Sequence, residues 1–521
     1  MTDEQPLRFN ALTDPWLPLL QDDGSTVWAS FVEVLAGEKD GPELDYPRDD
    51  FRVFARLLLS ALVQALFPAK DKAELIKRLA TPLKRAEIDA RIAPVLGDFD
   101  LFGPRPFLQV VAPTNVVEGG AAPFVFPAED LFTTPSPIDA ISIPVALVTL
   151  FIEQTFAGGA GRGYGAGPAG QPGALTLVDA GSIRSSAWAN TLTSENASPN
   201  YAKEAPVPWS NEKRSGSRRD AVGLVTGLFF QSRGAWLIPA GSGVCSFSGE
   251  VGLLVKRSPL MPKSDLAKKA SGGEDLWQHP CAPLAVNSQG IAPIRLSADQ
   301  PAWTGLAQLL HPVSKNKAKK DHTREGPAPV LQQWKTLGWR GTRVTPRLIV
   351  LDYDRDKANV KRRFFEAYPL SNLLVSSPAL LELMRALIDD AQTVQRRLAK
   401  ALISAHDDQR RGGFALREAE TSFWRDSEPT FLRWLGGTST SDEWTDEAAE
   451  RAQANGAEMR SLIRRSALGI FDEHVEMSEF DPTKAARIAK ARRSLRRDLY
   501  SPSSPPPAGQ PHTGEHDHAA K

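Results

Sequence analysis

The chain has 521 residues, of which 41% are hydrophobic and 24% charged, the composition of a globular protein that can bury a core. Its 62 basic residues balance 62 acidic ones, which excludes a protein that coats nucleic acid through overall positive charge and leaves only a local basic patch for such a contact. Two cysteines, a polar start and the lack of a long apolar run indicate a cytoplasmic protein without disulfides, signal peptide or membrane span.

The first clear helix signal is "YPRDDFRVFARLLLSALVQALF". Asp49 or Asp50 is its expected N-cap, and Pro68 follows directly after its last residue. Later, "GLVTGLFFQSRGAWLIP" contains two β-prone runs joined by a turn at residues 232–234, which predicts a hairpin. With the long Gly-, Pro- and Trp-rich stretches around them, these elements predict a mixed α+β, loop-rich domain over residues 1–366.

From residue 367 onward the pattern becomes helical. Ser377 and Pro378 form an N-cap with a first-turn proline. Apolar residues then recur at steps of three and four along one stripe: Leu380, Met384, Leu387, Ala391, Val394, Leu398 and Leu402.

Three further helices are expected after this one. They lie around residues 414–435 with an interruption at Pro429, after a capping box from Thr440 to Glu443, and from Asp481-Pro482 to about residue 500. Joined by short loops, the four predict a four-helix bundle over residues 367–500. The Pro- and His-rich tail at 501–521 has nothing to bury and is expected to be disordered.

Eight glycines crowd the eighteen residues "FAGGAGRGYGAGPAGQPG", from Phe156 to Gly173. The segment meets the loosest dinucleotide-binding pattern, but Pro168 and Pro172 exclude the helix whose N-terminus would hold a pyrophosphate. A flexible linker and a loop that lies against a partner both fit these residues. Glycine permits close approach of the backbone, and the arginine among the glycines suits a narrow, negatively charged groove.

Aspartates alternate in "LDYDRDKANVKRRFF", residues 351–365, at Asp352, Asp354 and Asp356. The run departs from a calcium loop, because Lys357 stands at the sixth position and Arg363 at the twelfth. If the segment is a hairpin, the three aspartates share one face near its turn. A solvated charged turn and a basic hairpin tip that meets DNA both fit this pattern.

No catalytic or metal-binding constellation is present in the sequence. His279-Pro280-Cys281 lacks a third orienting group and is interpreted as structural. The motifs H-E-x-x-H and G-x-S-x-G and paired-cysteine zinc spacings are all missing. We therefore expect no cofactor. Several basic runs in a chain without net charge, among them residues 211–219, 263–269 and 314–324, indicate a segregated positive surface.

Taken in order, short motifs along the chain resemble those of the large subunit of the type I-E CRISPR surveillance complex Cascade, the family commonly called CasA. The resemblance extends to about residue 500 and is carried by "TDPWLPL", "PRDD", "FPAKDKAE", the glycine loop, "GLFFQ", "LWQHPC", "PAWT" and "DYDRDKA". It implies a non-catalytic subunit that recognises the protospacer-adjacent motif (PAM) in duplex DNA, largely from the minor groove. It also implies a role in opening the duplex for the guide RNA. The implied partners are target DNA, the other Cascade subunits with their crRNA-bearing core, and an effector helicase–nuclease, with no membrane.

The resemblance also implies site residues. The glycine loop that lies against the PAM duplex corresponds to Gly159, Ala160, Gly161, Arg162 and Gly163. The hairpin that wedges into the duplex corresponds to Tyr353–Ala358, including Tyr353, Asp356 and Ala358, with Lys357 at the wedge position. A PAM-contacting lysine corresponds to Lys268, with Lys269 as its neighbour. A loop that meets the crRNA-bearing core corresponds to Leu131, Phe132 and Thr133.

Two positions depart from the family pattern. Lys357 replaces the familiar wedge glutamine, and Arg162 stands where another glycine is expected. Both add positive charge to a minor-groove reader, which implies stronger electrostatic binding and tolerance of several PAMs. Some relatives carry cysteines spaced for zinc, whereas only Cys245 and Cys281 occur here, so no structural metal is expected.

Two other functions remain as alternatives. One is a metal-dependent nuclease that uses the Asp-rich turn at 352–356. The other is an RNA-binding scaffold with no DNA role, against which stand the zero net charge and the lack of an aromatic RNA-binding sheet motif.

Overall fold

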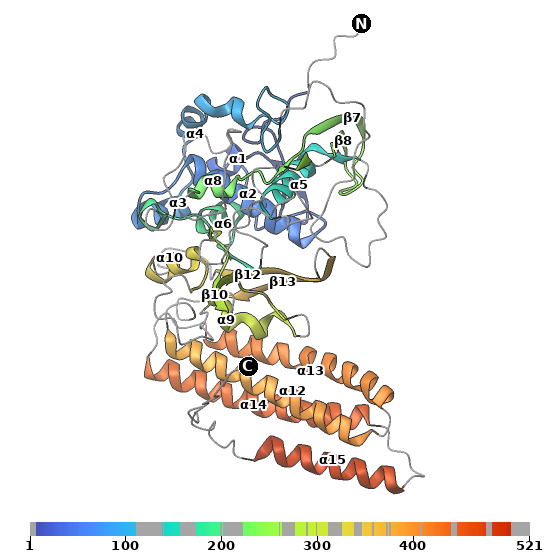
Figure 1. The fold of residues 1–521 in the computed structure, drawn as a ribbon. Coiled ribbons are helices and arrows are strands. Elements are labelled where there is room, and N and C mark those ends of the chain that lie inside the picture. The colour runs from blue at the N-terminus through green and yellow to red at the C-terminus, as the bar shows by residue number, and fades with distance from the viewer. Residues whose placement is uncertain are drawn as a thin grey trace, which may run out of the picture. The chain divides into compact units, whose positions relative to one another are not determined.

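The computed structural model describes residues 7–110, 138, 140–156, 173–197, 201, 222–259, 261–262, 277–287, 290–297, 300–310, 326–337, 346–356, 359–370, 374, 377–406, 409–438, 445–475 and 482–501 (Figure 1). The chain divides into two compact units. One comprises Met1–Glu382 with Thr438–Ala449, and the other Leu383–Gly437 with Glu450–Lys521. The first unit mixes small sheets with helices and the second is helical, so the α+β class with a helical C-terminal region is confirmed.

The N-terminal part of the first unit combines a small antiparallel sheet with helices. β1 (Leu17–Leu20) lies between β2 (Thr26–Ala29) and β3 (Glu43–Leu44). The helices of this part are α1 (Phe31–Ala36), α2 (Asp49–Leu66), α3 (Lys72–Ala80), α4 (Arg85–Ile92) and the 3-10 helix η1 (Ala93–Phe99). Ser30 and Glu33 form a capping box that starts α1.

Helix α2 lies in the core of the first unit. Fifteen of its 18 residues are buried, so it contacts neighbours on every side. The expected helix is present, but the predicted cap was wrong, since the N-cap residue is Arg48 and its side chain makes no capping hydrogen bond. Asp49 and Asp50 are the first helical residues, and the Asp50 carboxylate binds Arg48 and the distant Tyr353 instead.

A second sheet has the strand order β4–β8–β7, with α5 following directly after its first strand. Its elements are β4 (Ile141–Ser142), β7 (Leu237–Val244), β8 (Val251–Arg257) and helix α5 (Ile143–Thr155). A two-stranded sheet beside these pairs β6 (Arg233–Gly234) with β9 (Met261–Pro262).

The hairpin predicted over residues 223–239 was wrong. Its first apolar run forms the short helix α8 (Leu224–Leu228), and β7 pairs with β8 instead. A short apolar run has the same pattern in a buried helix as in a buried strand. Here Gly227 allows the Trp277 indole to pack directly on the α8 backbone, a contact that the sequence does not reveal.

The remaining strands of the first unit form two sheets. β5, β12 and β13 form a three-stranded sheet in the order β13–β12–β5, and β10 pairs with β11. The bounds are β5 (Leu175–Asp179), β10 (Leu284–Asn287), β11 (Gly290–Pro293), β12 (Arg347–Asp356) and β13 (Asn359–Pro369). The helices around them are α6 (Ile183–Ala189), α7 (Ser194–Ala197), η4 (Ala302–Gly305), α9 (Leu306–Leu310) and α10 (Pro329–Leu337).

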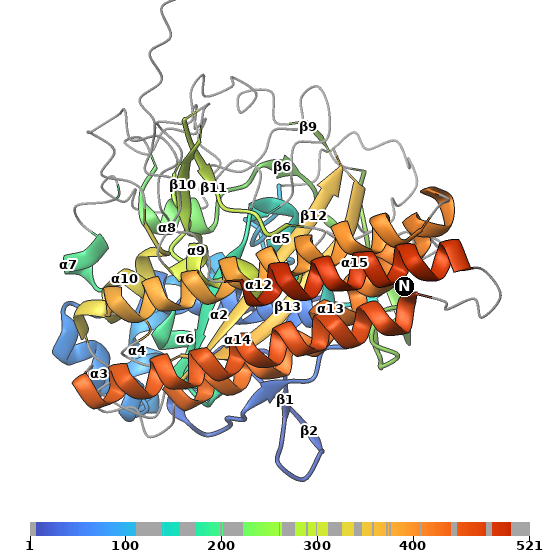
Figure 2. The same cartoon turned by 90° about the horizontal axis from the view of Figure 1, so that it is seen from below.

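Four long helices dominate the second unit and run side by side in Figures 1 and 2. They are α12 (Pro378–Ala405), α13 (Gln409–Thr438), α14 (Asp446–His474) and α15 (Pro482–Tyr500). All seven residues of the predicted apolar stripe on α12 are buried. Trp434 on α13 donates to the Ala452 carbonyl of α14 at 3.0 Å, and Arg487 on α15 donates to the Ala405 carbonyl of α12 at 3.1 Å.

The predicted ends of these helices have different outcomes. Ser377 caps α12, because its hydroxyl accepts from the Leu380 N–H at 3.3 Å. The predicted interruption at Pro429 was wrong, since α13 continues through it with Phe431 and Trp434 buried on the next turn. The capping box at 440–443 and the tail from residue 502 lie outside the described residues.

Candidate nucleic-acid interface

The hairpin expected near residues 351–365 is present (Figure 2). β12 and β13 pair antiparallel along their length, ending with Asp356 opposite Asn359 on either side of residues 357–358. The register shifts between Asp354 and Arg355, whose partners are Arg362 and Val360, so Lys361 is an extra residue on β13 at this point.

The same sheet contains the strand that follows the glycine loop. β5 pairs antiparallel with β12, with Leu175 opposite Leu351. Strand β12 continues beyond Leu351 to Asp356, five residues or about 17 Å farther along. Gly173, two residues before Leu175, must be a glycine, because a Cβ there would lie 2.2 Å from the Ile294 carbonyl oxygen. The exit of the glycine loop therefore lies at the end of the sheet from which the hairpin extends.

The segment that carries Lys268 and Lys269 returns to the same strand. The Thr176 N–H of β5 donates to the Cys281 carbonyl at 2.8 Å, and the Thr176 hydroxyl donates to it at 3.2 Å. Trp277 is the first described residue after the lysine segment, and its indole packs on Gly227 of α8. A Cβ on Gly227 would lie 2.1 Å from the indole ring. The glycine loop thus leads directly into β5, and the chain that follows the lysine segment reaches the same end of β5 at Cys281.

A cavity of about 20 Å³ lies where these ends meet, and its lining includes Phe156, Gly173, Trp277 and His279. Burial lowers the pKa of His279 to about 3, so its imidazole is neutral at physiological pH. Its Nδ1 accepts from the Cys281 N–H at 3.1 Å, and burial raises the pKa of the Cys281 thiol. The imidazole thus contacts the backbone N–H of Cys281, whose thiol faces Asn190 at 3.9 Å, which supports the structural interpretation of this pair.

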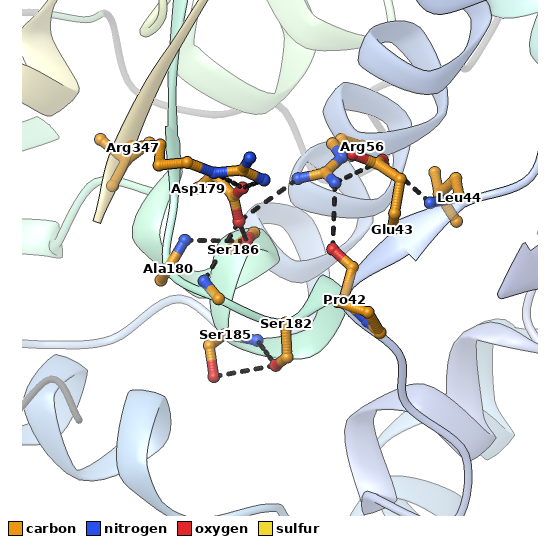
Figure 3. Close-up of polar contacts among 12 residues, drawn as sticks. Pro42, Glu43, Leu44, Arg56, Asp179, Ala180, Ser182, Ser185, Ser186 and Arg347 are labelled. Carbon is orange, nitrogen blue, oxygen red and sulfur yellow. Dashed lines mark hydrogen bonds and ion pairs between the residues drawn. The ribbon is translucent and has the colours of Figure 1, made fainter. Parts of the chain in front are cut away.

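A buried polar network ties the other end of β5 to β12 and α2 (Figure 3). Asp179, only 1% exposed, accepts from Arg347 at 2.5 and 3.0 Å, and Arg56 lies 3.6 Å from its other oxygen. The Ser186 hydroxyl also donates to it at 3.1 Å, and Arg56 pairs with Glu43 at 2.6 Å. Burial alone would raise the pKa of Asp179, but Arg56 and Arg347 hold that pKa below its ordinary value. The carboxylate therefore stays charged and links three elements.

The structure describes only part of the predicted site. Outside the described residues lie Leu131, Phe132, Thr133, Gly159, Ala160, Gly161, Arg162, Gly163, Lys268, Lys269, Lys357 and Ala358. Asp356 is the last residue of β12. Tyr353 is only 7% exposed, and its hydroxyl donates to Asp50 at 2.8 Å. That contact assigns the phenol a supporting role, while a part for Tyr353 in DNA binding stays a prediction.

Sequence reasoning missed the residues that support the loops. Thr176 and Cys281 are 105 positions apart, and Asp50 and Tyr353 are 303 apart, so no local pattern relates them. The stretch "LWQHPC" was visible as a motif, but its contact with β5 is a tertiary feature.

Asp352, the first aspartate of the Asp-rich turn, is bonded to backbone N–H groups of the protein itself. Asp352 is 2% exposed and accepts backbone N–H bonds from Leu296 at 2.7 Å and Tyr353 at 2.8 Å. Within the ranges that the structure describes, no group of three or more His, Cys, Asp or Glu side chains could hold a metal ion. In those same ranges no helix is both long enough and apolar enough to cross a membrane.

Comparison with known proteins gives a consistent result. The family model described as CRISPR-associated protein Cse1 matches residues 10–469. CasA from Thermus thermophilus is similar with a TM-score of 0.68 and 19% identity, over 94% of this chain and 99% of that one. Cse1 from Acidimicrobium ferrooxidans gives 0.69 and 19%, over 95% and 98%. A chain of a structure described as a CRISPR RNA-guided surveillance complex gives 0.66 and 17%, over 94% and 100%.

Proposed function

This chain belongs to the family of CRISPR-associated protein Cse1, the large subunit of type I-E Cascade, and we propose that it recognises the PAM in duplex DNA. In this proposal it reads the minor groove, promotes opening of the duplex so that the guide RNA can pair, and recruits the effector helicase–nuclease. It performs these steps by binding and positioning, without catalysing a reaction itself.

One observation carries the proposal. The glycine loop leads directly into β5, and the chain after the lysine segment is bonded to β5 at Cys281. β5 in turn pairs with β12, the first strand of the wedge hairpin. Three elements that come from distant parts of the sequence thus share one sheet as their support. A reader that must hold a groove and part the strands beside it needs such fixed spacing between its contacts.

The residue types fit a minor-groove reader. Gly159, Gly161 and Gly163 would let the backbone approach bases in a narrow groove. Arg162 and Lys357 would add positive charge where the groove potential is negative. Because the minor groove distinguishes A·T from G·C only coarsely, we expect this protein to accept more than one PAM.

The proposed partners follow from the assembly in which a similar chain is found. That chain belongs to a structure described as a CRISPR RNA-guided surveillance complex. We propose that residues 131–133 meet the crRNA-bearing core of the corresponding complex here. An isolated subunit without net charge would bind DNA weakly and in a salt-sensitive way.

The test is binding of short DNA duplexes, with and without a PAM, by the purified chain and by the chain assembled with its crRNA-bearing core, at two salt concentrations. We expect tight, PAM-dependent binding only in the assembled complex. Equal binding to all duplexes, with no dependence on the core, would refute the proposed function.

The nuclease alternative is tested by the double variant Asp354→Asn, Asp356→Asn. In our proposal the protein cleaves no DNA before or after this change. Metal-dependent cleavage by the wild-type chain that the double variant abolishes would favour the alternative.

A further inference from the structure

The side chain of Asp50, on α2, accepts a hydrogen bond from the wedge hairpin formed by β12 and β13. Its side chain is fully buried, and its Oδ2 accepts from the Tyr353 hydroxyl of β12 at 2.8 Å. Arg48 binds the same carboxylate through two hydrogen bonds of 3.0 and 2.6 Å, and the Phe51 N–H donates to Oδ1 at 3.0 Å. These donors hold the acceptor in one orientation.

The second strand of the hairpin is attached at the same level. Arg363 on β13 lies directly opposite Tyr353 in the strand register. Its guanidinium lies 3.3 Å from Asp49 and 3.9 Å from Asp50. Both strands are therefore attached, at a single cross-strand pair, to the first turn of α2.

This attachment has a mechanical consequence for the tip. Strand β12 ends at Asp356, three residues and about 10 Å beyond Tyr353. A two-stranded hairpin is only marginally stable by itself, and the register shift after Asp354 interrupts the ladder between the attachment and the tip. Helix α2, with 15 of its 18 residues buried, is by contrast held on all sides. The carboxylate of Asp50, together with that of Asp49, thus connects a rigid core helix to the hairpin.

We infer that Asp50 and Tyr353 are positioning residues for duplex opening. They hold the base of the hairpin so that its tip meets the DNA at a fixed place and can part the strands. This inference rests on the proposed function. Neither residue needs to touch DNA for it to hold.

The experiment uses the complex assembled with its crRNA-bearing core and two DNA targets of the same sequence. One is an intact duplex, and the other carries unpaired bases next to the PAM. Opening of the intact duplex is followed by the fluorescence of 2-aminopurine placed beside the PAM, and binding of the second target is measured separately. Tyr353→Phe removes only the hydroxyl that reaches Asp50.

We expect Tyr353→Phe to slow opening of the intact duplex about tenfold, the size expected for loss of a hydrogen bond to a charged group. Binding of the pre-opened target should stay at the wild-type level, because that target needs no wedge. Asp50→Asn, which also weakens the attachment of Arg363, should slow opening at least as much. The matched control is Tyr368→Phe, the same change in β13 opposite Leu348, which should open DNA at the wild-type rate.

The outcomes separate this inference from the proposed function. The positioning role is refuted if the Tyr353→Phe complex opens the intact duplex at the wild-type rate, or no more slowly than the Tyr368→Phe complex. It is also refuted if Tyr353→Phe weakens binding of the pre-opened target as much as it slows opening of the intact duplex. If the wild-type complex itself opens no PAM-containing duplex, the proposed function is refuted, and the inference with it.

Discussion

The carboxylate of Asp179 lies at the end of β5 between two arginines from different elements. It is buried, and Arg56, which faces it, is 3% exposed. Taking charges out of water is costly, and Arg347, Arg56 and Ser186 together offset that cost. Removing one partner of such a pair leaves a buried charge unmatched, so the effect on stability is larger than for a surface ion pair.

Asp179→Asn should lower the free energy of unfolding of the first unit by about 3 kcal/mol at pH 7, the usual cost of breaking a buried pair. The wild-type pKa of Asp179 lies below its ordinary value of 3.8. Its contribution is therefore fully present above pH 3.8 and is lost as pH falls through the lowered value. Urea unfolding at about pH 7 and about pH 3 should show the difference between variant and wild type shrinking in acid.

The control for this change is Asp472→Asn in the second unit. Asp472 pairs with Arg492 through two hydrogen bonds of 2.6 and 2.7 Å, but both side chains are 46% exposed. Exposed pairs contribute about 0–1 kcal/mol, so little change is expected. Equal losses for the two variants would show that burial is not the decisive factor.

At the scale of elements, helix α8 packs closely against the segment that begins at Trp277. Gly227 lies within a helix, where alanine would ordinarily be favoured by about 1 kcal/mol. The indole of Trp277 occupies the space that an alanine methyl would need. Because the ring and the methyl cannot both fit, the contact dominates over helix propensity and fixes the end of the lysine segment.

Gly227→Ala should therefore destabilise the first unit by about 1–3 kcal/mol, the cost of overpacking a buried contact. Calorimetric melting of the full chain measures the effect. Gly97→Ala in η1 is the control, since a Cβ there meets no atom within 4 Å. A melting temperature for Gly227→Ala at or above that of wild type would contradict the close packing of Trp277.

For the whole molecule, the equal numbers of acidic and basic residues mean that DNA binding depends on individual positively charged side chains near the DNA. Sixty-two charges of each sign leave no net attraction to a polyanion. The proposed contacts at Arg162 and Lys357 would then account for a measurable part of the salt dependence.

Arg162→Ala and Lys357→Ala should each lower the slope of log affinity against log salt by about one, because each removes one phosphate-type contact. The measurement is a salt titration of PAM-duplex binding by the assembled complex. Lys84→Ala, an exposed lysine that precedes α4, is the matched control and should leave the slope unchanged. Unchanged slopes for both Arg162→Ala and Lys357→Ala would refute the electrostatic role.

Local patterns in the sequence were sufficient for the long helices and for the class of the fold. The stripe from Leu380 to Leu402 and the Ser377 cap predicted α12, and successive motifs led to the correct family, because both depend on neighbouring residues. Asp50 was one of two residues predicted as a cap, and Gly227 was predicted as part of a hairpin, since neither residue carries a local sign of its distant partner. Only the tertiary structure placed β5 beside β12, Cys281 against Thr176 and Asp50 against Tyr353. Those pairings form because buried polar groups need hydrogen-bond partners at close range. The spacing of residues along the chain does not indicate which groups will meet.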